Sequence, residues 1–158
     1  MQQDCKIYLQ VAKYAKSYYG SDDYSKGKII NEQYANLKKE ISILYEEIYK
    51  KEIDSLKESS EVDGRAEIKL KRINENVMDA HSKDRINNEH YTDIKNEISI
   101  AYKKIFNERI MSGAVEIDEI REYIAEAYSD NKITEKHYEL LNEKISKMIQ
   151  DSGSNSPN

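Results

Sequence analysis

Three histidines are the side chains best suited to chemistry in this sequence, because imidazole binds metal ions and transfers protons near neutral pH. His90 and His137 each directly precede a tyrosine, while His81 lies in another segment. Metal sites built on one helix show paired histidines, as in HxxxH or HExxH, and neither pattern occurs in the sequence. We therefore predict that the histidines are structural or solvated, and we expect no metal ion.

The sequence also lacks the motifs of common enzyme classes. It contains no nucleophile elbow, P-loop or dinucleotide fingerprint. Its glycines are too scattered for a phosphate-binding loop, at positions 20, 27, 64, 113 and 153. Carboxylates precede lysines by four residues, as in Glu46 and Lys50, which is typical of a solvated helix surface. We expect no catalytic residue and no cofactor, and we predict that the protein is not an enzyme.

Helix–loop–helix patterns in the sequence also have the outline of a calcium-binding EF-hand. In that loop the sixth residue is a glycine and the twelfth is a bidentate carboxylate. When Gly27, Asp84 and Asn131 are set at the sixth position, the twelfth position carries no carboxylate but Gln33, His90 and His137. The ligand chemistry therefore argues against calcium binding.

Composition predicts a helical protein of one domain. At 158 residues, the chain can bury a core without disulfide bonds or metal ions. Charged residues make up 35 % of it, with one proline and five glycines, which is typical of long helices with charged outer faces. The single cysteine, Cys5, cannot form an internal disulfide bond, so nothing requires an oxidising compartment.

Charge and hydropathy limit the partners and the location. The net charge is −5 and lysines alternate with glutamates, so no field favours nucleic acid or an anionic membrane. The 13 tyrosines could stack on single-stranded nucleic acid only beside a basic groove. No apolar run approaches the ~18 residues of a membrane span, and Asp4 lies where a signal peptide carries positive charge. We expect a cytoplasmic protein that does not bind membranes.

One phrase occurs three times, which predicts an internal repeat. It reads DYSKGKIINEQYANLKKEIS from Asp23, AHSKDRINNEHYTDIKNEIS from Ala80 and AYSDNKITEKHYELLNEKIS from Ala127. The copies align with offsets of 57 and then 47 residues, so the first contains an insertion, which we place around residues 57–63. Isoleucine and tyrosine recur at fixed places in the phrase: Ile29, Ile86 and Ile133, then Tyr34, Tyr91 and Tyr138, then Ile41, Ile98 and Ile145.

Apolar residues spaced alternately by three and four predict a helix on each side of every turn. In the second copy they are Ala66, Leu70, Ile73, Val77 and Ala80 before the turn and residues 91, 94, 98, 101 and 105 after it. We expect an all-α fold of three helix-turn-helix hairpins, about six helices, over residues 5–20 and 31–58, 65–81 and 88–111, and 114–128 and 135–150. The hairpins would form one domain over residues 1–150, as an elongated bundle or a short helical array, with a disordered tail at 151–158.

The residue types in the turn explain why the phrase recurs. Gly27, Asp84 and Asn131 are of the types that best tolerate a left-handed backbone, so we expect the chain to reverse there with positive φ. The shared isoleucine that follows would close the hydrophobic end of the hairpin. Asn87 and Thr134 lie where an N-cap accepts a hydrogen bond from the first helical turn. Every recurring residue therefore has a structural explanation.

The segment K-I-T-E-K-H-Y-E-L-L-N-E-K-I, residues 132–145, resembles the short helical hairpin modules of the SHOCT type. These pair an apolar helix with a G-x-I-[ST]-x-x-E-[FY] turn and a second helix. The segment also resembles hairpins of the form AYSKGKI-x-E-x-HY in uncharacterised archaeal proteins. The resemblance implies a small all-α interaction or oligomerisation module without catalysis. This chain differs by containing three copies with longer second helices.

The charged faces vary between the copies, whereas the recurring residues are explained by folding. We therefore expect a non-catalytic helical scaffold or adaptor that mediates protein–protein interaction or oligomerisation, with a protein or itself as partner. The alternative is a small regulatory protein that binds nucleic acid through a hairpin helix, based on the interleaved lysines and tyrosines.

Overall fold

The protein is all-α, as the sequence predicts. A computed structural model describes residues 31–58, 64–113 and 115–153, and the regular secondary structure in these ranges is α-helix. The helices are α2 (Asn31–Glu58), α3 (Arg65–Ser82), α4 (Asn88–Ser112), α5 (Ile117–Ser129) and α6 (Glu135–Gly153). The helix expected at residues 5–20 lies outside the described residues, as do residues 59–63 of the expected insertion and the tail from residue 154.

The bounds of α2, α3 and α4 agree with the expected ones to within one residue, and those of α5 and α6 differ by more. Helix α5 begins at Ile117 rather than at residue 114, because Glu116 has the extended backbone of an N-cap, with φ −62° and ψ 141°. Helix α6 continues to Gly153, past the expected end at residue 150. The expected tail at 151–158 is therefore wrong for its first three residues, since Asp151 and Ser152 extend the helix and the first helix-breaking residue is Gly153.

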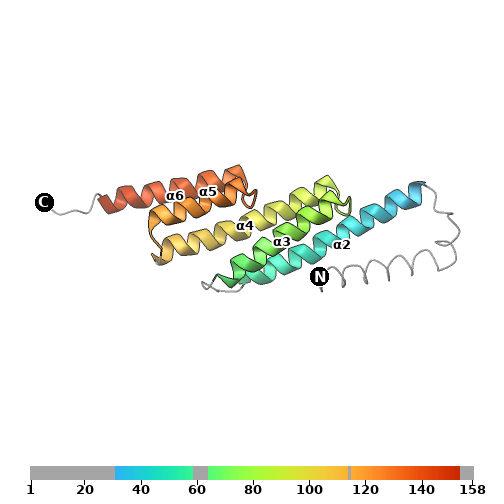
Figure 1. Ribbon diagram of the computed structural model, residues 1–158, viewed down its shortest axis with the longest axis horizontal. Helices are drawn as coiled ribbons and strands as arrows, with labels where there is room; N and C mark the ends of the chain where they lie inside the picture. The colour runs from blue at the N-terminus through green and yellow to red at the C-terminus, as the bar shows by residue number, and fades with distance from the viewer. Residues whose placement is uncertain (1–30, 59–63, 114, 154–158) are drawn as a thin grey trace.

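The helices form an elongated arrangement with α4 in the middle (Figure 1). Helices α2 and α3 pack against each other and against α4, and α5 and α6 do the same. Among the described residues, the backbone of α2 or α3 does not come close to that of α5 or α6. Within the described residues, helix α4 is therefore the element whose backbone packs against both halves.

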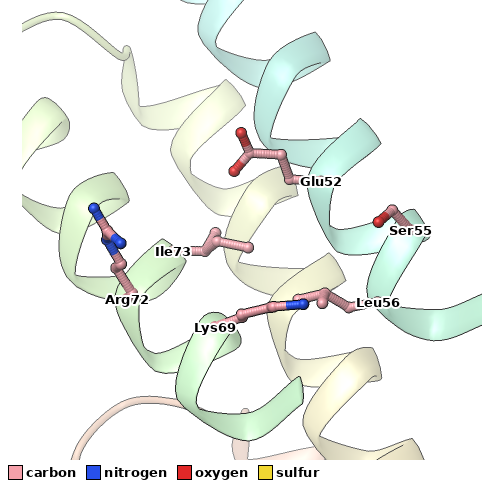
Figure 2. A pocket seen from close by; sticks show the side chains of 6 residues that line it. All are labelled: Glu52, Ser55, Leu56, Lys69, Arg72 and Ile73. Atoms are coloured by element: carbon pink, nitrogen blue, oxygen red, sulfur yellow. The ribbon is translucent and has the colours of Figure 1, made fainter. Parts of the chain in front are cut away.

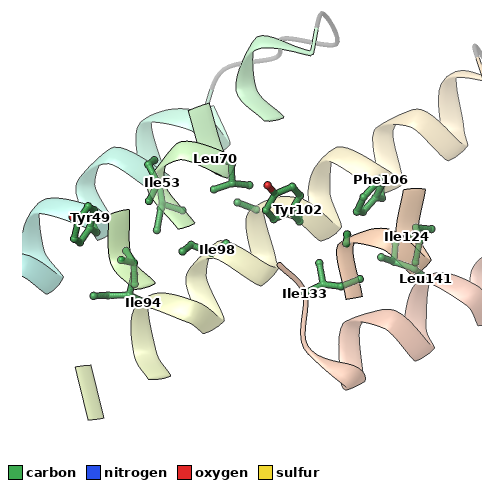
Figure 3. Packing of buried hydrophobic residues seen from close by; sticks show 14 of the residues in the cluster. Tyr49, Ile53, Leu70, Ile94, Ile98, Tyr102, Phe106, Ile124, Ile133 and Leu141 are labelled. Carbon is green, nitrogen blue, oxygen red and sulfur yellow. The ribbon is translucent and has the colours of Figure 1, made fainter. Parts of the chain in front are cut away.

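Helix α4 is buried on more than one side, because it carries helices from both halves. Its buried apolar residues include the predicted Ile94, Ile98 and Ala101, and also Tyr102, Phe106 and Ile110. On α2, Tyr45 and Tyr49 are likewise buried. One continuous cluster joins both halves, and Figure 3 shows Tyr49 and Ile53 at one end of it and Ile124 and Leu141 at the other.

The two described turns have the backbone expected from their sequence. Asp84 and Asn131 have φ of 56° and 54°, in the left-handed region. The residue after each donates its N–H to the end of the preceding helix: Arg85 to Ala80 O at 2.9 Å and Lys132 to Ala127 O at 2.8 Å. The shared isoleucines of these turns are buried. None of the described helices is both long and apolar enough to span a membrane.

Candidate interaction site

Ser42 on α2 is buried and holds the start of α4. The Asn87 N–H donates to Ser42 Oγ at 2.9 Å, and His90 Nδ1 lies 2.7 Å from the same oxygen. Asn87 also caps α4, since its Oδ1 accepts from the His90 N–H at 2.8 Å. N–H groups at a helix start have no partner within the helix, so these bonds satisfy them. Ser42, Asn87 and His90 are named the Ser42 joint below.

Ser99 on α4 holds the start of α6 in the same way. The Thr134 N–H donates to Ser99 Oγ at 2.8 Å, and His137 Nδ1 lies 2.6 Å from that oxygen. Both serines are only 1 % exposed. Ser99 follows Ser42 by 57 residues, and His137 follows His90 by 47, which are the offsets that align the three phrases. Ser99, Thr134 and His137 are named the Ser99 joint below.

A lysine one helical turn before each serine contacts the left-handed turn residue. Lys38 forms an ion pair with Asp84, and Lys95 donates to the carbonyl oxygen of Asn131. Lys95 Nζ also donates to Asn74 Oδ1 on α3, at 2.5 Å. Burial lowers the pKa of Lys95 to about 8, because a low-dielectric environment disfavours the ammonium form. Each joint therefore has a second polar contact, to the turn itself.

A pair of stacked aromatic rings lies beside each serine along its helix. The ring centroids of Tyr45 and Tyr49 are 6.1 Å apart, and those of Tyr102 and Phe106 are 6.2 Å apart. All four side chains are buried. Burial, followed by the negative charges of nearby acidic residues, raises the pKa of Tyr102. The polar joints are therefore backed by apolar packing.

The shared tyrosines stack on an aromatic ring of the preceding helix. Tyr91 stacks on His81 with centroids 4.0 Å apart, and Tyr138 on Tyr128 with centroids 4.6 Å apart. Tyr91 and Tyr138 are partly buried against the core. These rings close the turn between two consecutive helices, which gives His81 a packing role.

The two joints differ in the charge next to the histidine. His90 Nε2 lies 3.6 Å from Glu46 Oε2, whereas the position related to Glu46 on α4 is Lys103. Burial in the first place, and then the positive charges of Lys103 and Lys136, lower the pKa of His137. The Ser99 joint therefore favours a neutral imidazole.

A groove of about 320 Å³ lies between α2 and α3 (Figure 2). It is lined by Glu52, Ser55 and Leu56 from α2 and by Lys69, Arg72 and Ile73 from α3. This lining has a single carboxylate and no histidine, so it offers neither a carboxylate pair nor an imidazole base. The groove has the chemistry of a helix boundary with complementary charges.

By the offsets of the repeat, the boundary between α4 and α5 corresponds to the boundary between α2 and α3, but the charges at the corresponding positions are of opposite sign. Arg109 replaces Glu52, while Glu116 and Glu119 replace the two cations of α3. Arg109 pairs with Glu67 on α3 and lies 5.8 Å from the ring centre of Tyr123 on α5.

Among the described residues, no group of three or more His, Cys, Asp or Glu side chains is placed to hold a metal ion. The predicted positions Gly27 and Ile29 lie outside the described residues, and Tyr34 lies in α2 with an undescribed side chain. Asp84 and Ile86 lie in the turn between α3 and α4, and Asn131 and Ile133 lie in the turn between α5 and α6.

Sequence reasoning missed the serines. The signal was present, because each repeated phrase ends in serine directly after a shared isoleucine, at Ser42, Ser99 and Ser146. A polar residue that recurs beside an apolar seam indicates a buried hydrogen bond. The partner of that bond could not be read from the phrase, since it lies in the next copy.

Comparisons with known proteins find no match: no protein-family model, no curated protein and no solved structure matches the chain. In both joints, a serine oxygen on one helix meets the start and the imidazole of a later helix.

Proposed function

We propose that the protein is a non-catalytic, cytoplasmic scaffold or adaptor that mediates protein–protein interaction or oligomerisation. In this proposal it consists of three hairpins docked in series, and residues 5–20 supply a sixth helix that pairs with α2. The observation that carries the proposal is the occurrence of the same joint at Ser42 and at Ser99. In the described residues the backbone of α2 or α3 does not come close to that of α5 or α6, which also supports a serial arrangement.

The outer surface supports a role in binding because, in the described part of the chain, its two most exposed large apolar residues have no exposed apolar residue at the related position. Ile68 on α3 is 72 % exposed and Met111 on α4 is 71 % exposed. The positions related to them are Val115, which packs against the core, and Asp54, which is acidic. Exposed apolar side chains are common singly, but they dominate the contacts where partners bind. These two residues are therefore the first to test.

Affinity capture from the organism of origin tests the proposal. The tagged chain is compared with the double variant Ile68→Glu/Met111→Glu, and with Ile100→Glu as a matched control at another exposed apolar site, 42 % exposed. We expect a specific protein to be captured by the chain and by the control, and in smaller amount by the double variant. A chain that captures no protein and stays monomeric at every concentration would contradict the scaffold function.

A further inference from the structure

Helix α6 carries a third serine at the position that forms joints on α2 and α4. Ser146 follows Ser99 by the same 47 residues that separate His137 from His90. It is exposed, and its Oγ donates to the Asn142 carbonyl oxygen at 2.9 Å within its own helix. Ser42 and Ser99, in contrast, are buried and accept from the start of a following helix.

The apolar surface next to Ser146 repeats the pattern of the two joints. Ile149 is at the position of Tyr45 and Tyr102, which are buried in the core, yet Ile149 is 42 % exposed. Leu140, also on α6, is 39 % exposed, but its related positions are the exposed polar residues Asn36 and Asp93. The surface at Ile149 therefore continues a face that is covered elsewhere in the chain, whereas Leu140 does not.

The chain itself contains a segment of the type that covers this face. The repeated phrase occurs three times in the sequence, and so does the serine that ends it. The two joints pair the turn of the second copy with Ser42 and the turn of the third copy with Ser99. Residues 24–34, where the sequence predicts the turn of the first copy, are named the first turn below; they and Ser146 belong to neither of these two joints. Helix α2 starts at the position related to the starts of α4 and α6, which puts Gln33 at the place of His90 and His137. A glutamine amide can donate to a serine oxygen, as an imidazole N–H can.

We propose that α6 is a docking face for the first turn of a second copy of this chain. Ser146 Oγ would accept from the start of the partner's α2 and from the Gln33 amide, and Ile149 would be covered. The two surfaces in this contact are different, so the association is head-to-tail and open-ended. The inference rests on the proposed function, because it takes the joint as the unit of assembly.

The contact between copies should be weaker than the joints within the chain. Isoleucine replaces the buried tyrosine of α2 and α4, and Asn142 replaces the lysine that contacts the turn at Lys38 and Lys95. Association of two molecules also costs translational and rotational freedom that an internal joint does not lose. We therefore expect assembly at high protein concentration and single chains at low concentration.

Two variants, each blocking one end, test the head-to-tail contact by sedimentation equilibrium. Ile149→Asp charges the α6 face and leaves the first turn intact, while Gln33→Trp obstructs the turn and leaves the face intact. For the unchanged protein, the mass should rise with concentration beyond that of two chains of 18.5 kDa. Each variant alone should stay at one chain, and their equimolar mixture should stop at two, because only one pair of intact ends remains. Leu140→Asp, the matched control, should assemble like the unchanged protein.

Several results would overturn the inference. If Gln33→Trp assembles by itself, α6 pairs with α6 or with another surface. If the mixture remains single chains, or if Leu140→Asp loses assembly as Ile149→Asp does, the face has been misassigned. If the unchanged protein stays a single chain at every concentration, the second copy is not the occupant; capture of a different protein would then still support the scaffold function. Equal thermal unfolding curves at low concentration verify that the variants are folded.

Discussion

Replacing Ser99 with alanine removes the oxygen at the centre of one joint. The Thr134 N–H, which donates to this oxygen at 2.8 Å, would lose its partner, and so would His137 Nδ1 at 2.6 Å. Ser99 is only 1 % exposed, so water cannot readily replace its oxygen. The substitution should therefore reduce the free energy of unfolding.

The size of the loss follows from two opposing effects. A buried polar group that loses its partner costs about 1–3 kcal/mol. Alanine favours a helix over serine by about 0.5 kcal/mol, which offsets part of this cost. Thr134 and His137 are only partly buried, which places the cost in the lower part of the range. We expect Ser99→Ala to lose about 1–2 kcal/mol.

Ser146→Ala is the matched control, because Ser146 is the related residue on α6 and makes only a bond within its own helix. Its removal should leave stability unchanged or raise it by up to about 0.5 kcal/mol. Urea unfolding followed by far-ultraviolet circular dichroism at low protein concentration measures both variants. Ser42→Ala should resemble Ser99→Ala, since both serines accept from the start of a later helix. If Ser99→Ala and Ser146→Ala differ by less than about 0.5 kcal/mol, the joint does not stabilise the fold as argued.

Three further predictions concern pH, a buried hydroxyl and nucleic acid. Burial, Lys103 and Lys136 lower the pKa of His137 below its unfolded value of 6.5, so the unfolded chain binds this proton more readily. Stability should therefore fall from pH 7 to pH 5, and it should fall less in His137→Asn; urea midpoints at both pH values test this. The Tyr102 hydroxyl is buried without a hydrogen-bond partner in the described residues. Tyr102→Phe should therefore leave the free energy of unfolding unchanged or raise it by up to about 1 kcal/mol, seen as an equal or higher melting temperature. Because cations are not clustered, no gel shift with single-stranded nucleic acid is expected even at low salt; a shift would favour the alternative function.

Much of the secondary structure could be predicted from local sequence. The predicted bounds of α2 agree with the structure, and those of α3 and α4 differ by one residue at the C-terminal end. The left-handed residues Asp84 and Asn131 were predicted from their type. These features depend on residues within a turn or two of the chain, which is why apolar spacing and turn chemistry are sufficient for them.

The packing was predicted less completely. A seam of three-four spacing predicts one buried face, but α4 also buries Tyr102 and Phe106. The reason is that α4 packs against helices on both sides. The spacing of apolar residues in a helix does not predict how many other helices will pack against it. The start of α5 and the end of α6 were predicted wrongly. Each depends on a single residue: Glu116 has an extended backbone just before α5, and α6 continues to Gly153.

The sequence by itself determined where the chain is helical and where it turns, because those choices are made by neighbouring residues. Only the tertiary structure decided what the shared serines do. Ser42 and His90 are separated by 48 positions, and Ser99 and His137 by 38, so their contacts exist only when whole helices pack. The same packing covers two of the three related serines and leaves Ser146 exposed, a distinction that three nearly equal phrases in the sequence could not make.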